Sequence, residues 1–218
     1  MKKTSVQVLI TIIITLIGQF GIYKDLRAQD SQWSKESKNI SYFHIGIRRI
    51  EIMSPDKIKN IIVDSSKLDL LINEKPLPRM SDIYVETLAE LLWSPNSKAF
   101  VLSQSDGGWV GRWYVVVYKI KNGHVLKLNI GKSIIKSFKK YYSCAEVEEP
   151  NIAAIKWLRG GKELLMVAEV PPHSSCPEMG KIRGYIVDLL SEKITKEIDE
   201  KKFRKKWNCY LGVRFIKN

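Results

Sequence analysis

Several patterns on which enzymes depend are missing from this chain of 218 residues. The nucleophile elbow Gly-x-Ser-x-Gly does not occur, which argues against the hydrolases that carry it. No glycine-rich loop precedes the lysine and helix that a phosphate site requires. There are three histidines and three cysteines, and the pair His173 and Cys176 has no further histidine or cysteine at close ligand spacing. The sequence therefore predicts neither a cofactor nor a metal centre.

Long apolar runs are also scarce, except at the amino terminus. Lys2 and Lys3 precede an uncharged, mostly branched apolar stretch at 6–17, and Ala28 suits the last position before cleavage. We expect residues 1–28 to be an export signal, and the mature chain to be periplasmic or secreted with no membrane span. An uncleaved anchor that tethers the protein is the alternative, because 4–23 carries no charge and approaches the length of a bilayer span.

Positive charge exceeds negative charge throughout the chain. The net charge is +13, and it falls to +10 without residues 1–28, which hold four basic residues and one acidic residue. Two basic clusters stand out: Lys132, Lys136, Lys139 and Lys140, and then Lys201, Lys202, Arg204, Lys205 and Lys206. An exported basic protein can bind an anionic envelope polymer or another envelope protein. No nucleic acid is expected outside the cytoplasm, and a plain solvated basic surface is the simpler interpretation.

The three cysteines are Cys144, Cys176 and Cys209. Disulfides persist in oxidising compartments, so an exported chain is expected to form at least one. We favour Cys144–Cys176, because Cys144 precedes the second of two similar segments described below and Cys176 lies in a turn region of that segment. Cys209 is then the odd thiol. Spacing leaves the other two pairings open.

A first unit of strands is predicted around Trp93. Two buried strands are indicated by the apolar residues before Trp93 and by the run 99–104. The turn Ser94–Ser97 connects them. The segment 112–118 is rich in aromatic and β-branched residues, as strands are. Asn122-Gly123 then predicts a hairpin to a strand at 124–128. The outcome is a four-stranded meander.

A weaker copy of this unit follows. The segments 153–157, 164–168, 183–189 and 193–198 match the four strands in order, with a longer loop at 169–181. Phe203 and Trp207 then lie four residues apart, on one face of a helix that Asp199 can cap. We expect this helix to cover a sheet edge. Residues 29–41 are polar and lack periodicity, and they are expected to form a flexible lead-in.

The motif Trp93-Ser94-Pro95-Asn96-Ser97-Lys98, followed by an apolar strand, resembles the W-S-P-D-G-K blade signature of TolB-type and related WD-like β-propellers. A remnant of the motif occurs at 53–57. Propellers close with four to eight four-stranded blades, whereas the mature chain has residues for three or four. We expect an all-β fold of antiparallel four-stranded meanders, propeller-blade-like or sandwich-like, with a short C-terminal helix, in one β-rich domain at 42–218.

Loop residues are the best candidates for a binding surface. Aromatic side chains beside charges suit recognition of sugars or peptides, so we select Asp106, Trp109 and Arg112, together with His173. The plainer interpretation is that Trp109 covers a sheet edge and Trp113 is core. The predicted function is a non-enzymatic binding or scaffold module of the bacterial envelope. The alternatives are a small hydrolase or redox enzyme centred on His173 and Cys176, and a domain that assembles with further copies into a ring.

Overall fold

The computed structural model describes residues 30–41, 49–64, 66–76, 83–105, 107, 111–128 and 130–216. The chain divides into two units, Met1–Asp30 and Ser31–Asn218. The predicted export signal at 1–28 lies outside the described residues. Within the described part of the chain, no helix combines the length and the apolar character needed to cross a membrane.

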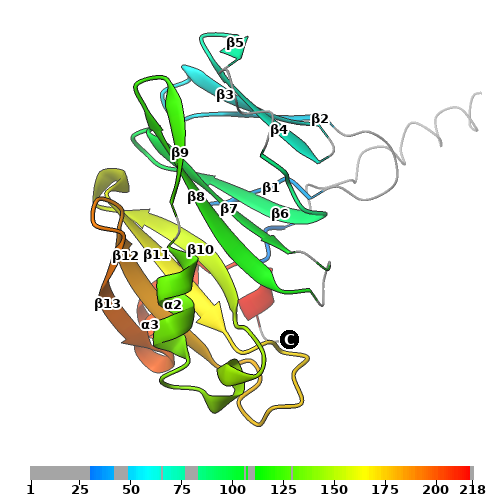
Figure 1. Ribbon diagram of the computed structural model, residues 1–218, viewed down its shortest axis with the longest axis vertical. Coiled ribbons are helices and arrows are strands. Elements are labelled where there is room, and N and C mark those ends of the chain that lie inside the picture. Colours follow the sequence, from blue (N-terminus) through cyan, green and yellow to red (C-terminus); the bar gives the residue numbers. More distant parts are fainter. Residues whose placement is uncertain are drawn as a thin grey trace, which may run out of the picture. The chain divides into compact units, whose positions relative to one another are not determined.

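Three antiparallel sheets of sequentially adjacent strands form the framework of the described unit (Figure 1). The first sheet contains β2 (Arg49–Met53), β3 (Lys59–Asp64), β4 (Lys67–Ile72) and β5 (Lys75–Pro76). The second contains β1 (Lys38–Asn39), β6 (Leu88–Trp93), β7 (Ala99–Ser105), β8 (Trp113–Lys121) and β9 (His124–Leu128). The third contains β10 (Asn151–Leu158), β11 (Glu163–Glu169), β12 (Ile182–Asp188) and β13 (Lys193–Asp199). The predicted all-β class and both predicted meanders are confirmed.

The Ser-Pro turns have the same hydrogen bonds in the first and second sheets. The Ser54 hydroxyl donates to the Asp56 carboxylate at 2.6 Å, and the Ser94 hydroxyl donates to the Asn96 side chain at 2.8 Å. In each turn the residue three positions after the serine has a positive φ, 60° and 54°. The shared motif therefore encodes one turn geometry, as expected from its sequence.

Each turn also bonds to the turn of the next sheet. The Asp56 main-chain N–H donates to the Ser97 hydroxyl at 3.0 Å, and the Asn96 amide donates to the Gly160 carbonyl at 2.8 Å. Gly160 belongs to the short 3₁₀ segment Arg159–Gly161, which links β10 to β11. The three sheets are thus joined in sequence at their turns.

Tryptophans make a second repeated link between sheets. The Trp93 indole donates to the Ile52 carbonyl at 3.4 Å, and the Trp157 indole donates to the Leu92 carbonyl at 3.1 Å. In both cases the accepting carbonyl belongs to the next-to-last residue of the strand that leads into the Ser-Pro turn of the preceding sheet, β2 or β6. Trp157 is buried and Trp93 is half-buried, so each ring packs where the sheets meet.

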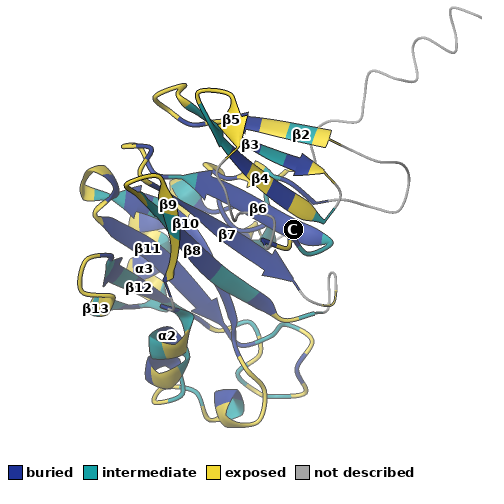
Figure 2. Cartoon of the chain, turned by 45° about the horizontal axis from the view of Figure 1, so that its top comes forward, coloured by how far each residue is buried: buried dark blue, intermediate teal, exposed yellow. Residues whose placement is uncertain are grey.

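Apolar side chains fill the spaces between neighbouring sheets. The first and second sheets enclose a cluster that includes Ile61, Leu70, Leu91, Phe100 and Leu102. The second and third enclose another, with Val101, Val117, Trp157 and Met166, to which a helix adds Ile134 and Phe138. Figure 2 shows the buried residues concentrated in β6–β8 and β10–β12, whereas β2 and β5 are largely exposed. Burial on both faces explains why the central strands read as continuous apolar runs.

The expectation of a flexible lead-in at 29–41 is wrong for the described residues of that segment. Trp33 is fully buried and contacts Trp113 and Phe215 edge-to-face, with ring centroids 5.7 and 5.6 Å apart. The Gly212 N–H donates to the Trp33 carbonyl at 2.9 Å. β1 then pairs with β6 at the edge of the second sheet. The polar sequence of this segment did not predict the packing, because one aromatic side chain and the main chain make most of the contacts.

The C-terminal helix forms as predicted but covers a different surface. α3 (Glu200–Trp207) begins after Asp199, whose side chain accepts from the Lys202 N–H at 2.9 Å. Phe203 packs on the outer face of the third sheet, where a Cβ at Gly184 would overlap its ring. The helix therefore covers the face of the sheet rather than the expected edge, because Gly184 leaves room for an aromatic ring there.

Candidate functional site

A cavity of about 590 Å³ opens between the second sheet, the start of β10 and α2 (Gly131–Phe138). Its volume is within the range of small-molecule sites. The apolar lining comes from all three elements and comprises Trp113, Val115, Val116, Leu128, Ile135, Pro150 and Ile152. Three cations, Arg112, Lys127 and Lys132, and one acid, Glu149, complete the wall. The cavity thus combines an apolar interior with charged residues.

The β8–β9 hairpin positions two of the cations. Asn122 and Gly123 have positive φ angles, 51° and 73°, as the expected hairpin turn requires. The turn pairs the end of β9 with the middle of β8, where Leu128 lies opposite Val117, and Lys127 then lines the same cavity as Arg112, which precedes β8. Both side chains are exposed. Local turn chemistry therefore determines this part of the site.

α2 supplies the third side of the cavity, and the sequence analysis did not predict it. Ile130, Ile134 and Phe138 are buried at a spacing of four residues, which is the helical signal that could have revealed it. Gly131 and Lys132, in the first turn, line the cavity. This turn has no acidic residue and no side-chain cap, so the positive end of the helix dipole lies next to the cavity wall.

The charges of the cavity are unequal. Arg112 forms an ion pair with Glu149, and its guanidinium lies 5.9 Å from the centre of the Tyr114 ring. Lys127 and Lys132 have no carboxylate partner among the described residues. Two exposed ammonium groups and a helix amino terminus therefore make the wall net positive. This arrangement favours a ligand that carries an anionic group next to an apolar portion.

Of the four residues selected from the sequence, the structure describes Arg112 and His173, and only Arg112 lines the cavity. Asp106 and Trp109 lie outside the described residues. His173 is exposed in the loop between β11 and β12 and is not among the residues that line the cavity. Trp113 is buried, in agreement with its interpretation as core. Sequence proximity found the arginine and missed the two lysines, which only the hairpin and α2 bring to it.

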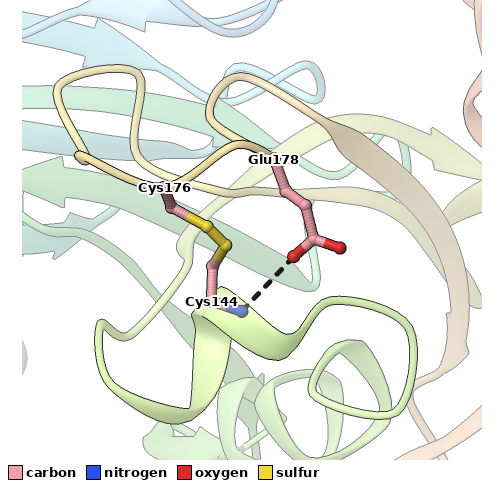
Figure 3. A group of neighbouring side chains, drawn as sticks. All are labelled: Cys144, Cys176 and Glu178. Atoms are coloured by element: carbon pink, nitrogen blue, oxygen red, sulfur yellow. Dashed lines mark hydrogen bonds between the residues drawn. A yellow bond between two sulfur atoms is a disulfide. The ribbon is translucent and has the colours of Figure 1, made fainter.

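The expected disulfide, Cys144–Cys176, is present, with the Cα atoms 6.0 Å apart. It joins the segment after α2 to the β11–β12 loop. Figure 3 shows Glu178 beside it, with a carboxylate oxygen that accepts from the Cys144 N–H at 3.3 Å. The two sulfurs and this carboxylate are close enough for metal ligands. Metal-binding cysteines are thiolates, so the bonded sulfurs have a structural role in this state.

A polar cluster anchors α2 to the third sheet. The Ser137 and Tyr141 hydroxyls donate to the two carboxylate oxygens of Glu197 on β13, at 2.6 and 2.7 Å. Arg183 lies 3.7 Å from the same carboxylate. Burial raises the pKa of Glu197, but the two hydrogen bonds and the charges of Arg183 and Lys140 outweigh it, so the pKa lies below its usual value. The ionised glutamate thereby fixes α2, and with it one wall of the cavity.

The sequence matches no protein-family model and no curated protein.

Proposed function

We propose that this chain is an exported, non-enzymatic binding module of the bacterial envelope, and that the cavity beside α2 takes an anionic ligand with an apolar portion. The observation that carries the proposal is the cavity itself, with apolar walls, the amino end of a helix and two lysines that pair with no carboxylate in the described part of the chain. Apolar side chains favour a hydrocarbon chain or a sugar face, and the lysines favour a carboxylate, sulfate or phosphate.

Export is supported by the disulfide and by the expected leader. Disulfides are typical of oxidising compartments, and Cys144–Cys176 is bonded. Three antiparallel meanders, two of which share a turn geometry, are what the proposed kinship to propeller blades would predict. Binding at the ends of such sheets needs no catalytic group. The partners proposed on this basis are an anionic envelope polymer or an envelope protein that carries such a group.

The alternative of a hydrolase or redox enzyme centred on His173 and Cys176 has less support. A cysteine nucleophile acts as a thiolate, and the Cys176 sulfur is bonded to Cys144. His173 is exposed, and no hydrogen bond to its ring occurs among the described residues. The binding module is therefore the function that the geometry favours.

Binding of a fluorescent amphipathic anion, anilinonaphthalene sulfonate, tests the cavity. Dodecanoate serves as a competitor, and a dodecyl chain on an uncharged head group serves as the uncharged comparison. We expect one site per chain, displaced by dodecanoate and weakly by the uncharged compound. The double variant Lys127→Glu/Lys132→Glu should bind the dye about tenfold more weakly, which is about 1.4 kcal/mol.

The matched control is Lys119→Glu/Lys121→Glu, with two lysines at the far end of β8. It carries the same change in net charge and should bind within about twofold of the unchanged protein. Circular dichroism during urea unfolding checks that all variants are folded. Equal dye binding by the three proteins, or several dye molecules per chain, would contradict the proposal.

A further inference from the structure

The two basic clusters, far apart in sequence, meet on opposite sides of the same edge strand. β13 is the last strand of the third sheet. α2 lies against one face of this sheet, packed on Met166, and α3 lies against the other, packed near Val167 (Figure 1). Successive residues of a strand point to opposite faces, so the two helices flank β13. The hydrogen bond from Ser137 to Glu197 holds α2 in place, and the Asp199 cap fixes the start of α3.

We use the term lysine belt for seven exposed lysines on or next to these three elements: Lys136 within α2, Lys140 just after it, Lys193 and Lys196 on β13, and Lys201, Lys205 and Lys206 on α3. None of the seven forms an ion pair among the described residues, although the charge of Lys140 acts on Glu197. Lys132 is left out of the belt because it lines the cavity described above.

The acidic residues near the belt are engaged elsewhere. Glu197 is held by two hydroxyls and Arg183. Asp199 caps α3 and pairs with Lys202 at 2.9 Å, and Glu200 pairs with Arg204 at 2.8 Å. Glu192, in the turn before β13, is the exposed exception. The belt therefore keeps most of its positive charge.

A groove of about 540 Å³ lies beside the belt, where the end of α3 crosses the third sheet. Leu158, Ile186 and Trp207 form its apolar part, and Lys196 and Lys206 belong to both the groove and the belt. Glu163 also lines the groove and pairs with Arg159 at 3.3 Å. The Trp207 indole N–H is buried without a hydrogen-bond partner among the described residues. An acceptor oxygen on a ligand could satisfy such a group.

We propose that the lysine belt binds a linear polyanion, an acidic polysaccharide of the cell envelope, which wraps around β13. The lysines lie on both faces of the sheet and along its edge, so they cannot all reach one plane. A flexible chain with regularly repeated carboxylates or sulfates can contact them in turn, whereas a flat bilayer can contact only one side. Lysines also protect sheet edges from pairing, but that role accounts only for Lys193 and Lys196, not for the lysines of the helices.

The test uses dextran sulfate as the polyanion and uncharged dextran as the comparison, with binding to the full chain followed by calorimetry. The belt variant is Lys136→Glu/Lys201→Glu, with one change on each helix. The matched control is Lys67→Glu/Lys75→Glu, with two exposed lysines of the first sheet. We expect the belt variant to bind dextran sulfate about fivefold more weakly, and the control within about twofold of the unchanged chain.

Equal weakening in both variants would overturn the proposal, because net charge alone would then explain the binding. Failure of the unchanged chain to bind dextran sulfate would also overturn the proposal. Vesicles of phosphatidylglycerol are the third probe. If the unchanged chain binds these vesicles but not dextran sulfate, and the belt variant binds them more weakly, the surface is assigned to lipid instead. The belt variant keeps Lys127 and Lys132, so dye binding in the cavity stays normal and separates this proposal from the proposed function.

Discussion

Glu90 shows how one side chain ties the amino-terminal segment to the sheets. It lies on β6 with a buried side chain, and one carboxylate oxygen accepts from the main-chain N–H of Gln32 and, at 3.0 Å, of Trp33. The other oxygen has no partner among the described residues. Burial raises the pKa of Glu90 from 4.5 to about 7, although these hydrogen bonds act in the opposite direction. The effect of burial on the pKa of Glu90 is therefore larger than the opposing effect of the hydrogen-bond donors.

The raised pKa of Glu90 predicts that stability decreases as pH rises. Between about pH 4.5 and about pH 7 the native state retains a proton that the unfolded chain loses, so the free energy of unfolding falls, by roughly 3 kcal/mol in total. Glu90→Gln keeps an acceptor oxygen and removes this titration. Urea unfolding at about pH 5 and about pH 8 should show a smaller decrease in the variant than in the unchanged protein. Parallel pH dependence in the two proteins would contradict this role.

At the scale of elements, two segments without strand structure are held by covalent or polar links. The short 3₁₀ segment Ser143–Glu146 contains Cys144, and the loop between β11 and β12 contains Cys176. The disulfide connects them over 32 residues, and the Glu197 cluster holds α2 just before them. Both links act at or just after the carboxyl end of α2, the helix that forms one wall of the cavity.

We predict that Cys144→Ser/Cys176→Ser lowers the free energy of unfolding by roughly 3.5 kcal/mol, because the cross-link restricts the unfolded chain. Urea unfolding with and without a dithiol reductant measures it. Cys209 is exposed and free, so Cys209→Ser serves as the control and should retain the full response to the reductant. A native protein in which Cys176 reacts freely with a thiol reagent would refute the pairing.

At the scale of the whole described unit, the segments near the two ends of this unit pair with each other. The N–H groups of Val213 and Arg214 donate to the carbonyls of Ser31 and Gln32 at 3.1 and 3.0 Å. Arg214 also forms a buried ion pair with Glu169 on β11, at 2.6 Å. Together with α3, these segments cover the outer face of the third sheet.

The outer face of the first sheet combines polar and apolar side chains. Glu51 receives hydrogen bonds from Arg49 and Asn60 there, and Asp69 on the same face is exposed. Met53 is exposed on this face as well, and Ile62 is half-buried. The two ends of the series of sheets therefore differ, and the ring assembly considered from the sequence stays a prediction.

Trp33→Ala tests the importance of the paired end segments for the whole unit. The ring is fully buried between Trp113 and Phe215, so its removal should lower the free energy of unfolding by about 3–5 kcal/mol. Leu190→Ala is the control, because Leu190 is 86% exposed, and it should change stability by less than about 0.5 kcal/mol. Chemical unfolding followed by circular dichroism gives both values. A small effect at Trp33 would restore the interpretation of 29–41 as a flexible lead-in.

Local patterns in the sequence determined the strands, the Ser-Pro and Asn-Gly turns, the capped helix after Asp199 and the cysteine pair. These features depend on residues close together in the chain or on few alternatives. The tertiary structure decided the rest: the burial of Trp33, the meeting of Lys127 and Lys132 with Arg112, and the joining of two lysine clusters around β13. These residues are far apart in the sequence, and local conformational preferences do not bring them together. The free energy of packing between the sheets determines which of them meet.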